Sequence, residues 1–451
     1  MPRLKALLSL FKNIHIQSLI GNAVMAVVGI GTMAILYRAL PVDQMGEYLF
    51  FIVVFTLIDS VKSGILTGSF LKFYSGTAKD RAKEVAGSAW VLALIISVAL
   101  MGANVITFFV APFVKGEGTI ILLKYFSLVM LTTLPSFMTN IAVQGEKRFD
   151  RLLWMRLINQ LSYILLIALE IVFKRATLEN VLWAYAISNA LASVATILLG
   201  WSEIGAIGHA TRKTVLELFH FGKYSMGTSL SANLYGVTDT FFIKVFLGPA
   251  ALAVYNLGIK FVQIIEIPML SFAASGMPAM ASYYNNDQYE NMMNLMKKMA
   301  GMLTLAFMAI ALVSLAMAEP VVRIFGGEKY VHTEAPNLLR IVITIGALYP
   351  IDRFFAMGLD VIHKPKINFY KVLLMLSINL VGDLVGVTVF KSVYAVALIN
   401  VFPVLVAIIV AYVPLNKFYP FRIRDLFTMG FAEIIKLIKQ ARQGLTGLSK
   451  V

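Results

Sequence analysis

The residues best suited to chemistry in this sequence are a few ionisable side chains inside long apolar segments. A charge in hydrocarbon costs about 2.5–3.5 kcal/mol on insertion scales, so each such side chain should face a cavity or a partner. An ammonium or guanidinium group at that depth can bind an anion, and a carboxylate can bind a proton or a cation. The candidates are Asp59, Lys62, Asp239, Lys260, Glu266, Asp352 and Arg353.

Arg353 is the first choice for a contact with an anion such as phosphate. It follows Pro350 and lies roughly 14 Å along its helix from the predicted cytoplasmic end, too deep to reach water easily. Its planar guanidinium group can hold two phosphate oxygens at once. The alternative is an ion pair with a carboxylate on another helix. Lys260 and Lys62 join Arg353 as the expected substrate contacts in a cavity.

Asp59 and Lys62 lie three residues apart and therefore share one face of a helix. One interpretation is an internal ion pair that lowers the cost of inserting both charges. The other is a direct role in lining a cavity, with Asp59 as an ion-coupling carboxylate.

Glu266 has no such neighbour, because Lys260 lies six residues away and off its face. Pro268 follows closely, and a proline inside a helix frees a backbone carbonyl and can kink the helix. Glu266 is therefore expected to meet a partner from another helix, either for ion coupling or in a structural hydrogen bond. Asp239 and Asp352 belong to the same group of ion-coupling or inter-helix polar residues.

The sequence lacks the machinery of most enzymes. It has no cysteine and only five histidines, which removes thiolate chemistry, disulfides, iron–sulfur clusters and cysteine-ligated zinc. No GxxxxGK[ST], GxSxG or HExxH motif occurs. We therefore expect no enzyme activity, no metal centre and no cofactor, apart from H⁺ or Na⁺ as a coupling ion.

The elements that position these side chains are transmembrane helices. Of the 451 residues, 59% are hydrophobic and 14% are charged, whereas a soluble domain carries roughly 25% charged residues. A crossing needs about 20 apolar residues, and this rule predicts an all-α polytopic membrane protein with about twelve transmembrane helices. The predicted spans are 16–37, 47–71, 86–113, 119–143, 153–173, 180–201, 224–247, 251–277, 299–325, 336–358, 368–390 and 393–413.

Basic loops set the predicted orientation. Lys and Arg gather in every second loop, and such loops face the cytoplasm. Both termini are therefore expected inside a bacterial inner membrane, and the net charge of +15 needs no nucleic-acid partner. The loop residues used are Lys72, Lys79, Arg81, Lys83, Lys147, Arg148, Arg151, Arg212, Lys213, Lys223, Lys297, Lys298, Lys364, Lys366 and Lys371.

Both ends of the chain are amphipathic. Residues 1–15 are predicted to be a cytoplasmic segment that is not cleaved as a signal peptide. Residues 414–451 form a cytoplasmic tail whose apolar face and basic residues suit the inner surface of an anionic membrane. A surface anchor and a regulatory element are the two interpretations of this tail.

The two halves of the chain resemble each other. Residues 21–59 match residues 227–266, with Tyr48 opposite Tyr255 and Asp59 opposite Glu266, and a second match aligns Pro135 with Pro350. Six-helix halves of the same orientation are related by an axis along the membrane normal. The sequence thus predicts an N-lobe at 16–201, a linker at 202–223 and a C-lobe at 224–413.

This pattern resembles the polysaccharide flippases of the multidrug/oligosaccharidyl-lipid/polysaccharide exporter superfamily. The resemblance rests on the segment TDTFFIKVFLGPAALAVYNLG in the seventh and eighth spans and on the inner loop after the proline-bearing fourth span. It implies a two-lobed transporter that moves an isoprenoid-diphosphate-linked oligosaccharide outward by alternating access, for lipopolysaccharide or related surface polysaccharides. A polysaccharide polymerase or glycosyltransferase is then an expected partner, besides membrane lipid.

Such a substrate gives roles to further residues. Arg353, Lys260 and Lys62 would contact the diphosphate, and Asn233, Tyr235 and Tyr255 are candidate contacts for the glycan. Most other aromatic residues and methionines are expected to face lipid or fill the interior. Arg38, Arg340 and Asp383 lie nearer the outer interface and are expected to act as anchors.

Three other functions stay open. A cation-coupled multidrug antiporter of the same superfamily would need a more acidic binding lobe. A non-transporting scaffold of an envelope-synthesis complex has little use for charges at bilayer depth. A membrane glycosyltransferase or ligase would normally need a large polar loop, which this sequence lacks.

Overall fold

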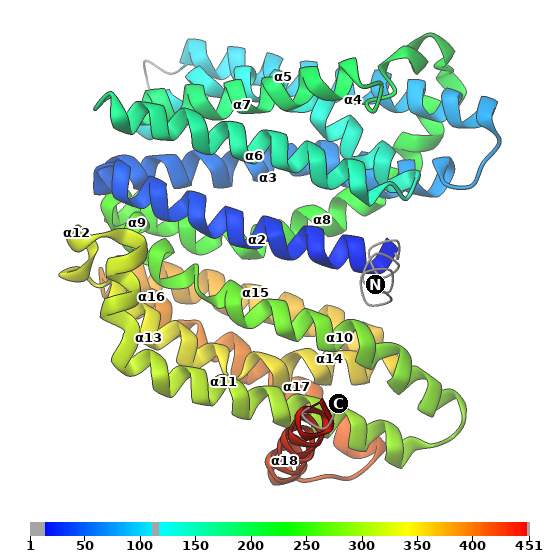
Figure 1. Cartoon of the computed structure of the whole chain (residues 1–451), viewed down its shortest axis with the longest axis vertical. Helices are drawn as coiled ribbons and strands as arrows, with labels where there is room; N and C mark the ends of the chain where they lie inside the picture. The colour runs from blue at the N-terminus through cyan, green and yellow to red at the C-terminus, as the bar shows by residue number, and fades with distance from the viewer. Residues whose placement is uncertain (1–13, 111–116, 449–451) are drawn as a thin grey trace. The chain divides into compact units, whose positions relative to one another are not determined.

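The computed structural model of the chain describes residues 14–110 and 117–448 (Figure 1), and every regular element in these ranges is a helix. Contacts divide the chain into two compact units, unit 1 at Met1–Val237 and unit 2 at Thr238–Val451. The division falls inside one long helix, α8. The lobe and linker boundaries expected from the sequence stay predictions.

Unit 1 contains the elements up to the first part of α8. Where the structure describes the connections, its helices are joined by short segments, as expected where consecutive spans reverse direction. Their bounds are α2 Ile14–Ala39, α3 Val42–Tyr74, α4 Lys79–Val110, α5 Glu117–Gly145, α6 Phe149–Val172, α7 Leu178–Leu198, the 3₁₀ helix η2 Ile204–His209 and α8 Arg212–Leu247.

Unit 2 begins inside α8 and has more broken helices. The span predicted at 251–277 is divided between α9 and α10, and the one at 336–358 between α13 and α14. The bounds are α9 Pro249–Ile259, α10 Val262–Asn285, α11 Tyr289–Gly326, α12 Glu328–Val331, α13 Ala335–Gly346, α14 Tyr349–Val361, α15 Pro365–Thr388, α16 Val393–Ile399, α17 Val401–Phe418 and α18 Ile423–Leu448.

The predicted fold class is confirmed, because each predicted span falls largely on helix within the described ranges, and the spans at 251–277, 336–358 and 393–413 are each divided between two helices. In the described ranges, nine helical segments are long and apolar enough to cross a membrane by themselves. The other three predicted spans lie in α2, in α8 and across the break between α9 and α10. The chain is an all-α polytopic membrane protein.

The turns that carry basic residues meet at one end of unit 1. The hydroxyl of Ser75, just after α3, donates to the carbonyl of Gly145 at the end of α5 at 3.3 Å. Tyr74 donates to the Glu146 carboxylate at 3.4 Å. These contacts bring the α3–α4 and α5–α6 turns together, so the basic loops that predict the cytoplasmic side share one end of the unit.

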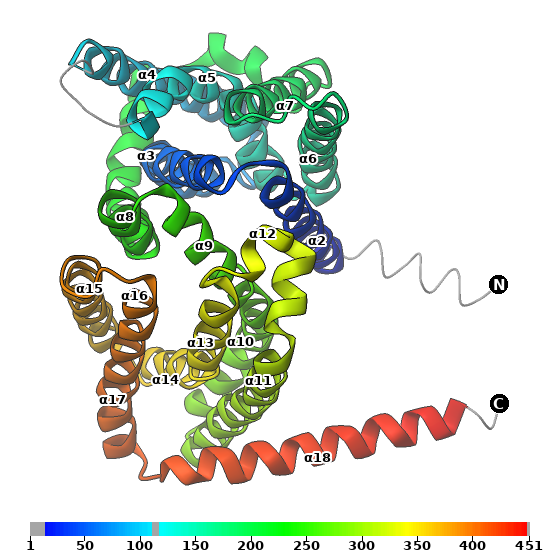
Figure 2. The same cartoon turned by 90° about the vertical axis from the view of Figure 1, so that its left-hand side faces the viewer.

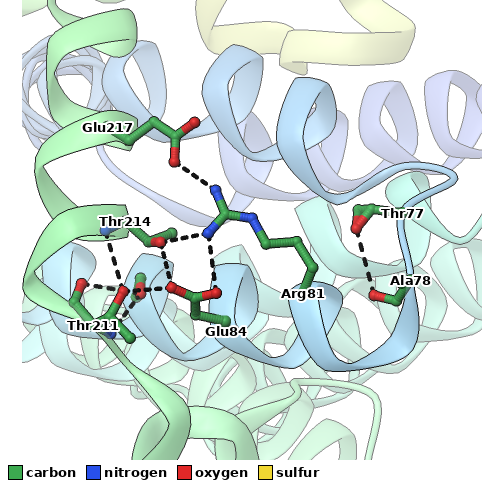
Figure 3. A network of polar contacts seen from close by, with 8 residues as sticks. Thr77, Ala78, Arg81, Glu84, Thr211, Thr214 and Glu217 are labelled. Carbon is green, nitrogen blue, oxygen red and sulfur yellow. Dashed lines mark hydrogen bonds and ion pairs between the residues drawn. The ribbon is translucent and has the colours of Figure 1, made fainter.

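A polar network at the starts of α4 and α8 fixes these two helices to each other (Figure 3). Arg81 donates to Thr214 at 2.6 Å and pairs with Glu217 at 2.5 Å. Its neighbour Glu84 pairs with it at 3.0 Å and accepts hydrogen bonds from Thr211 at 2.5 Å and Thr214 at 2.6 Å. Residues 212–223, expected in a linker, are therefore helical and attached to unit 1.

Glycines allow α3 and α8 to pack backbone against backbone within unit 1. A Cβ added at Gly222 would lie 2.1 Å from the carbonyl oxygen of Ile65, and one added at Gly64 would lie 2.8 Å from Met226 Cα. Small residues permit such close approach between membrane helices. This packing holds the first part of α8 against α3.

The C-terminal helix α18 packs on α11 and then runs on beyond it (Figure 2). The two helices cross at Gly301 and Gly430, where a Cβ added at Gly301 would lie 1.8 Å from the carbonyl oxygen of Leu426. Leu426 is fully buried, whereas Phe431 is 58% exposed. The predicted tail thus begins as a packed helix, and Pro414 still lies inside α17.

Candidate functional site

A cluster of two carboxylates, two amides and a tyrosine lies inside unit 2; Tyr255, Asn379 and Asp383 are buried, and Asp239 and Asn400 are half-buried. Asp239 comes from α8, Tyr255 from α9, and Asn379 and Asp383 from α15. Asn400 lies at the junction of α16 and α17. We call these five residues the carboxylate–amide cluster.

Hydrogen bonds connect every member of the cluster. Asn400 Nδ2 donates to Asp239 Oδ2 at 3.0 Å and to the Tyr255 hydroxyl at 3.2 Å. Tyr255 in turn donates to the Asp239 carboxylate. Asn379 Nδ2 donates to Asn400 Oδ1 at 2.8 Å, and it lies 3.4 Å from Oδ1 of both Asp239 and Asp383.

Two oxygens of the cluster are left without a hydrogen bond. Asp383 and Asn379 are 0% and 1% exposed, and Asp383 Oδ2 and Asn379 Oδ1 have no hydrogen-bond partner among the described residues. A buried acceptor left unpaired costs about 1–3 kcal/mol. Carboxylate and amide oxygens are ligands for hard cations. The arrangement is therefore suited to bind a proton or a small cation.

Local sequence explains how these residues meet. Asn379 and Asp383 are four residues apart, so they share one face of α15. Glycines on α15 let α16 approach closely, because a Cβ at Gly382 would lie 2.1 Å from Ile399 and one at Gly386 would lie 3.0 Å from Val396. Close contact of α15 with α16 brings Asn400, at the end of α16, beside Asn379.

Unit 1 makes comparable inter-helix contacts with neutral groups. Tyr48, the repeat partner of Tyr255, is also buried, and Tyr163 donates to its hydroxyl at 3.0 Å. On the neighbouring helix α2, Thr32 accepts a hydrogen bond from Gln160 at 2.5 Å. The two halves thus share buried tyrosines, but in unit 2 the tyrosine donates to a carboxylate, that of Asp239.

Asp59 and Lys62 form the internal ion pair that their spacing allows. Lys62 Nζ lies 2.6 Å from Asp59 Oδ1, and the Lys62 side chain is fully buried while that of Asp59 is 22% exposed. The ammonium also lies 4.9 Å from the ring centroid of Phe137 and 3.5 Å from the sulfur of Met130. A direct contact of Lys62 with substrate stays a prediction.

Asp352 pairs with Lys371 rather than with a neighbour on its own helix. The Lys371 ammonium lies 2.5 Å from Asp352 Oδ1, and its side chain is 4% exposed. The prediction that Lys371 belongs to a cytoplasmic loop is wrong, because α15 begins at Pro365 and places Lys371 well inside the helix. The exposed Arg353 makes no hydrogen bond or ion pair with any described residue.

Lys260 and Glu266 stand at the break between α9 and α10. Lys260 is half-buried and ends α9, whereas Glu266 is exposed on α10. Neither side chain makes a hydrogen bond or ion pair with a described residue, but Glu266 lies close enough to Tyr349 of α14 for an electrostatic interaction. Asn233 is half-buried on α8, and the side chain of Tyr235 lies outside the described residues.

Sequence reasoning missed three of the five cluster residues. Asp383 was expected to be an interfacial anchor, but it is fully buried. The available signal was the spacing of Asn379 and Asp383 on one face of an apolar span. Asn400 gives no comparable signal, because its role depends on the break between α16 and α17. The other expected glycan contact, Tyr255, is 1% exposed and belongs to the cluster.

The fold and the cluster define a multi-pass helical membrane protein with a polar site inside its spans. The chain belongs to the polysaccharide biosynthesis protein family, whose profile matches residues 10–284, more than half of its length. The MatE family profile matches residues 225–385. No curated protein matches the chain in sequence.

Several solved structures share the fold. An inward-facing multidrug resistance MATE family transporter of the MOP superfamily is 16% identical with a TM-score of 0.71, covering 89% of this chain and 95% of its own. The lipid II flippase MurJ, in an inward closed conformation, is 14% identical with a TM-score of 0.70, covering 93% and 91%. A MOP superfamily transporter from Pyrococcus furiosus is 17% identical with a TM-score of 0.58, covering 91% and 94%. At these identities the likeness shows the fold of MOP superfamily transporters.

Proposed function

We propose that the protein is a flippase that moves an isoprenoid-diphosphate-linked oligosaccharide from the cytoplasmic to the outer leaflet by alternating access. Membership of the polysaccharide biosynthesis protein family supports a glycan-related role. The likeness to MurJ, a lipid II flippase, and to MATE transporters supports transport of a membrane-bound substrate. The product would serve the synthesis of cell-surface polysaccharide.

The carboxylate–amide cluster is the observation that carries this proposal. Two carboxylates and two unpaired buried oxygens lie inside the spans, where each charge is expensive. A static structural role would be served at lower cost by neutral groups, as the tyrosine pair of unit 1 illustrates. Binding and release of H⁺ or Na⁺ at the cluster gives the carboxylates a function.

Arg353 is the proposed anion contact. Its side chain is exposed and makes no hydrogen bond or ion pair with a described residue, whereas the adjacent Asp352 is already paired with Lys371. A guanidinium group at this depth can form two hydrogen bonds to a diphosphate. Lys260, at the helix break, is the proposed second cation. The Lys260 ammonium group is a point charge and lacks the planar arrangement of donors of the Arg353 guanidinium group.

The membrane potential favours the proposed direction. Moving one elementary charge across 100 mV is worth about 2.3 kcal/mol, so two negative charges leaving an inside-negative cell gain on the order of 4–5 kcal/mol. An inward-moving cation bound at Asp239 and Asp383 would add to this gain. A sugar head group that crossed in a polar cavity would avoid the cost of about 2–7 kcal/mol for each hydroxyl stripped of water.

A cation-coupled multidrug antiporter is the second candidate. The MatE profile match at residues 225–385 favours it, because that range contains Asp239, Asn379 and Asp383 of the cluster. Arg353, which has no ion pair among the described residues, favours an anionic substrate instead. The flippase and the antiporter would share the coupling site and would differ in the transported substrate, an anionic lipid-linked glycan or a cationic drug.

Vesicles containing the purified protein separate these functions. One set carries a fluorescent polyprenyl-diphosphate oligosaccharide, whose sidedness is followed by quenching from outside, and a second set is given a fluorescent cationic drug. We expect movement of the lipid-linked glycan above that in empty vesicles and no accumulation of the drug. Drug movement without glycan movement would establish the antiporter and reject the flippase.

A further inference from the structure

A pocket of about 250 Å³ with polar and apolar side chains in its lining lies within unit 1, separate from the carboxylate–amide cluster. Residues of α2, α5, α6 and α7 line it, all between Met25 and Ala192. The pocket lies in spans that would otherwise be filled by apolar side chains. Its polar lining consists of Thr133, Ser136, Asn140, Arg156, Asn159 and Asn189.

A proline inside α5 lies beside one wall of the pocket. Pro135 lies inside the helix, and Ser193 of α7 inserts its hydroxyl at this point. The Ser193 hydroxyl donates to the carbonyl of Thr132 at 2.6 Å and accepts from the Ser136 amide at 3.2 Å. The Ser136 hydroxyl lies 2.8 Å from that of Ser193. Ser193 thus bridges the Thr132 carbonyl and the Ser136 amide, which a regular helix would pair directly, and residues of the following turn line the pocket.

Amide side chains on the opposite walls hold one another in fixed positions. Asn159 of α6 donates to the Asn189 carbonyl oxygen at 3.0 Å, and Asn189 donates to the backbone carbonyl of Tyr185 at 2.8 Å. Asn140 accepts a hydrogen bond from Gln144. These bonds use only part of the capacity of Asn140 and Asn159, each of which has several donor and acceptor positions. Fixed amides with spare capacity can bind hydroxyl groups of a ligand.

The charge of the lining is positive. Arg156 is its one ionisable residue, and the lining contains no acidic side chain among the described residues. Phe137 adds an aromatic ring, and the buried ammonium of Lys62 lies 4.9 Å from the centroid of this ring. Arginine can bind a carboxylate or a phosphate through two hydrogen bonds. The pocket therefore does not suit a cationic drug.

The size and position of the pocket restrict its ligand. The 250 Å³ of the pocket far exceeds the roughly 10–15 Å³ that one water needs on the same measure, so the pocket has room for an organic ligand such as a sugar ring. Arg156 lies roughly 10 Å along α6 from Phe149, beside the basic α5–α6 turn. The predicted orientation places this end at the cytoplasm, where the substrate would enter.

We propose that this pocket binds one sugar unit that carries an acidic group, with Arg156 on the carboxylate or phosphate. Asn140, Asn159 and Asn189 would bind the sugar hydroxyls, and Phe137 would contact the apolar edge of the ring. The inference rests on the proposed function, since a sugar site has a purpose in a carrier of glycans. It adds a substrate class, namely glycans that contain an acidic sugar.

Ligand-observed NMR on the full chain in lipid nanodiscs tests the pocket directly. The probes are methyl glucuronide, glucose 6-phosphate and the neutral methyl glucoside. We expect at least one acidic sugar to bind about tenfold more tightly than the neutral one. The two acidic probes distinguish a carboxylate from a phosphate. Absence of binding by all three, or equal binding of acidic and neutral sugars, would overturn the proposal.

Variants of the lining locate the binding. Arg156→Gln should reduce the preference for the acidic sugar to within about twofold, whereas Arg148→Gln, an exposed control on the α5–α6 turn, should retain it. If Arg156→Gln does not purify as a folded protein, Asn159→Ala and Asn189→Ala take its place, and each should weaken acidic-sugar binding roughly fivefold. Unchanged binding in the folded lining variants would reject the site.

The flippase proposal and the pocket proposal can fail separately. Sugar binding is measured without any transport, so a lack of glycan movement in vesicles would reject the flippase while leaving the binding result in place. Conversely, glycan movement with no sugar binding would reject the pocket alone.

Discussion

Asp239 and Asp383 come from different helices of unit 2, yet each places its Oδ1 atom 3.4 Å from the same amide nitrogen, that of Asn379. Two carboxylates that share one donor repel each other unless a proton or a cation lies between them. The buried Asp383 Oδ2, which has no hydrogen-bond partner among the described residues, adds to the need for such a charge. This relationship is the basis for proposing ion coupling at the cluster.

Replacing Arg353 tests the proposed anion contact. Arg353→Ala should reduce movement of the lipid-linked glycan by about tenfold or more, because the diphosphate loses a pair of charge-assisted hydrogen bonds. Arg353→Lys should recover part of the activity, since it restores the charge without the planar geometry. Arg424→Ala removes an exposed arginine on α18 and serves as the control. Wild-type movement in Arg353→Ala would reject the role of this residue.

The Asp59–Lys62 ion pair should be sensitive to the loss of one partner. Asp59→Ala leaves the fully buried Lys62 ammonium without its carboxylate, which should destabilise the protein by about 3–5 kcal/mol. The double variant Asp59→Leu/Lys62→Met removes both charges and should be more stable than Asp59→Ala. Thermal unfolding in detergent measures the difference. Equal stability of Asp59→Ala and the wild type would show that the pair contributes nothing.

Much of the fold follows from the sequence, because apolar length is a local property. The predicted span at 47–71 lies inside α3, and the i,i+3 spacing of Asp59 and Lys62 predicts their ion pair. The carboxylate–amide cluster is harder to predict from the sequence, since it brings together residues 239 and 400, which are 161 positions apart in the chain. Such contacts depend on where α15 and α16 pack, and this depends on Gly382 and Gly386.

The interpretation of Lys371 failed for a similar reason. For a lysine near the end of a span, the sequence does not distinguish a loop residue from the partner of a buried carboxylate. The pairing with Asp352 depends on the packing of α14 against α15, which hydropathy does not record.

The hydroxyl of Ser193 should stabilise the break at Pro135. Ser193→Ala removes the partner of both the Thr132 carbonyl and the Ser136 amide, and we expect a loss of about 1–3 kcal/mol. Adding Pro135→Ala allows α5 to close its own hydrogen bonds and should restore part of that stability. The control is Ser162→Ala, whose hydroxyl bonds only within α6. Equal melting temperatures for Ser193→Ala and Ser162→Ala would contradict the bridging role.

The crossing of α11 and α18 should depend on Gly301. Gly301→Ala places a methyl group against the Leu426 carbonyl, within 1.8 Å before any shift, so the start of α18 should separate from α11 and exchange its amide hydrogens faster. Gly102→Ala is the matched control, because nothing lies within 4 Å of its added Cβ and alanine is the better helix former. Hydrogen exchange followed by mass spectrometry compares the two. Unaltered protection of Leu426 to Gly430 in Gly301→Ala would contradict the packing.

The central claim is that a cation bound between Asp239 and Asp383 drives a lipid-linked glycan outward. The most direct measurement follows a fluorescent polyprenyl-diphosphate oligosaccharide in vesicles under an imposed Na⁺ or pH gradient, for the wild type, Asp239→Asn and Asp383→Asn. Ser377→Ala, an exposed position on α15, is the control. We predict that a gradient of one of these ions accelerates movement in the wild type and the control, and that both Asn variants lose this acceleration. Gradient-dependent movement that persists in Asp239→Asn and Asp383→Asn would contradict the account.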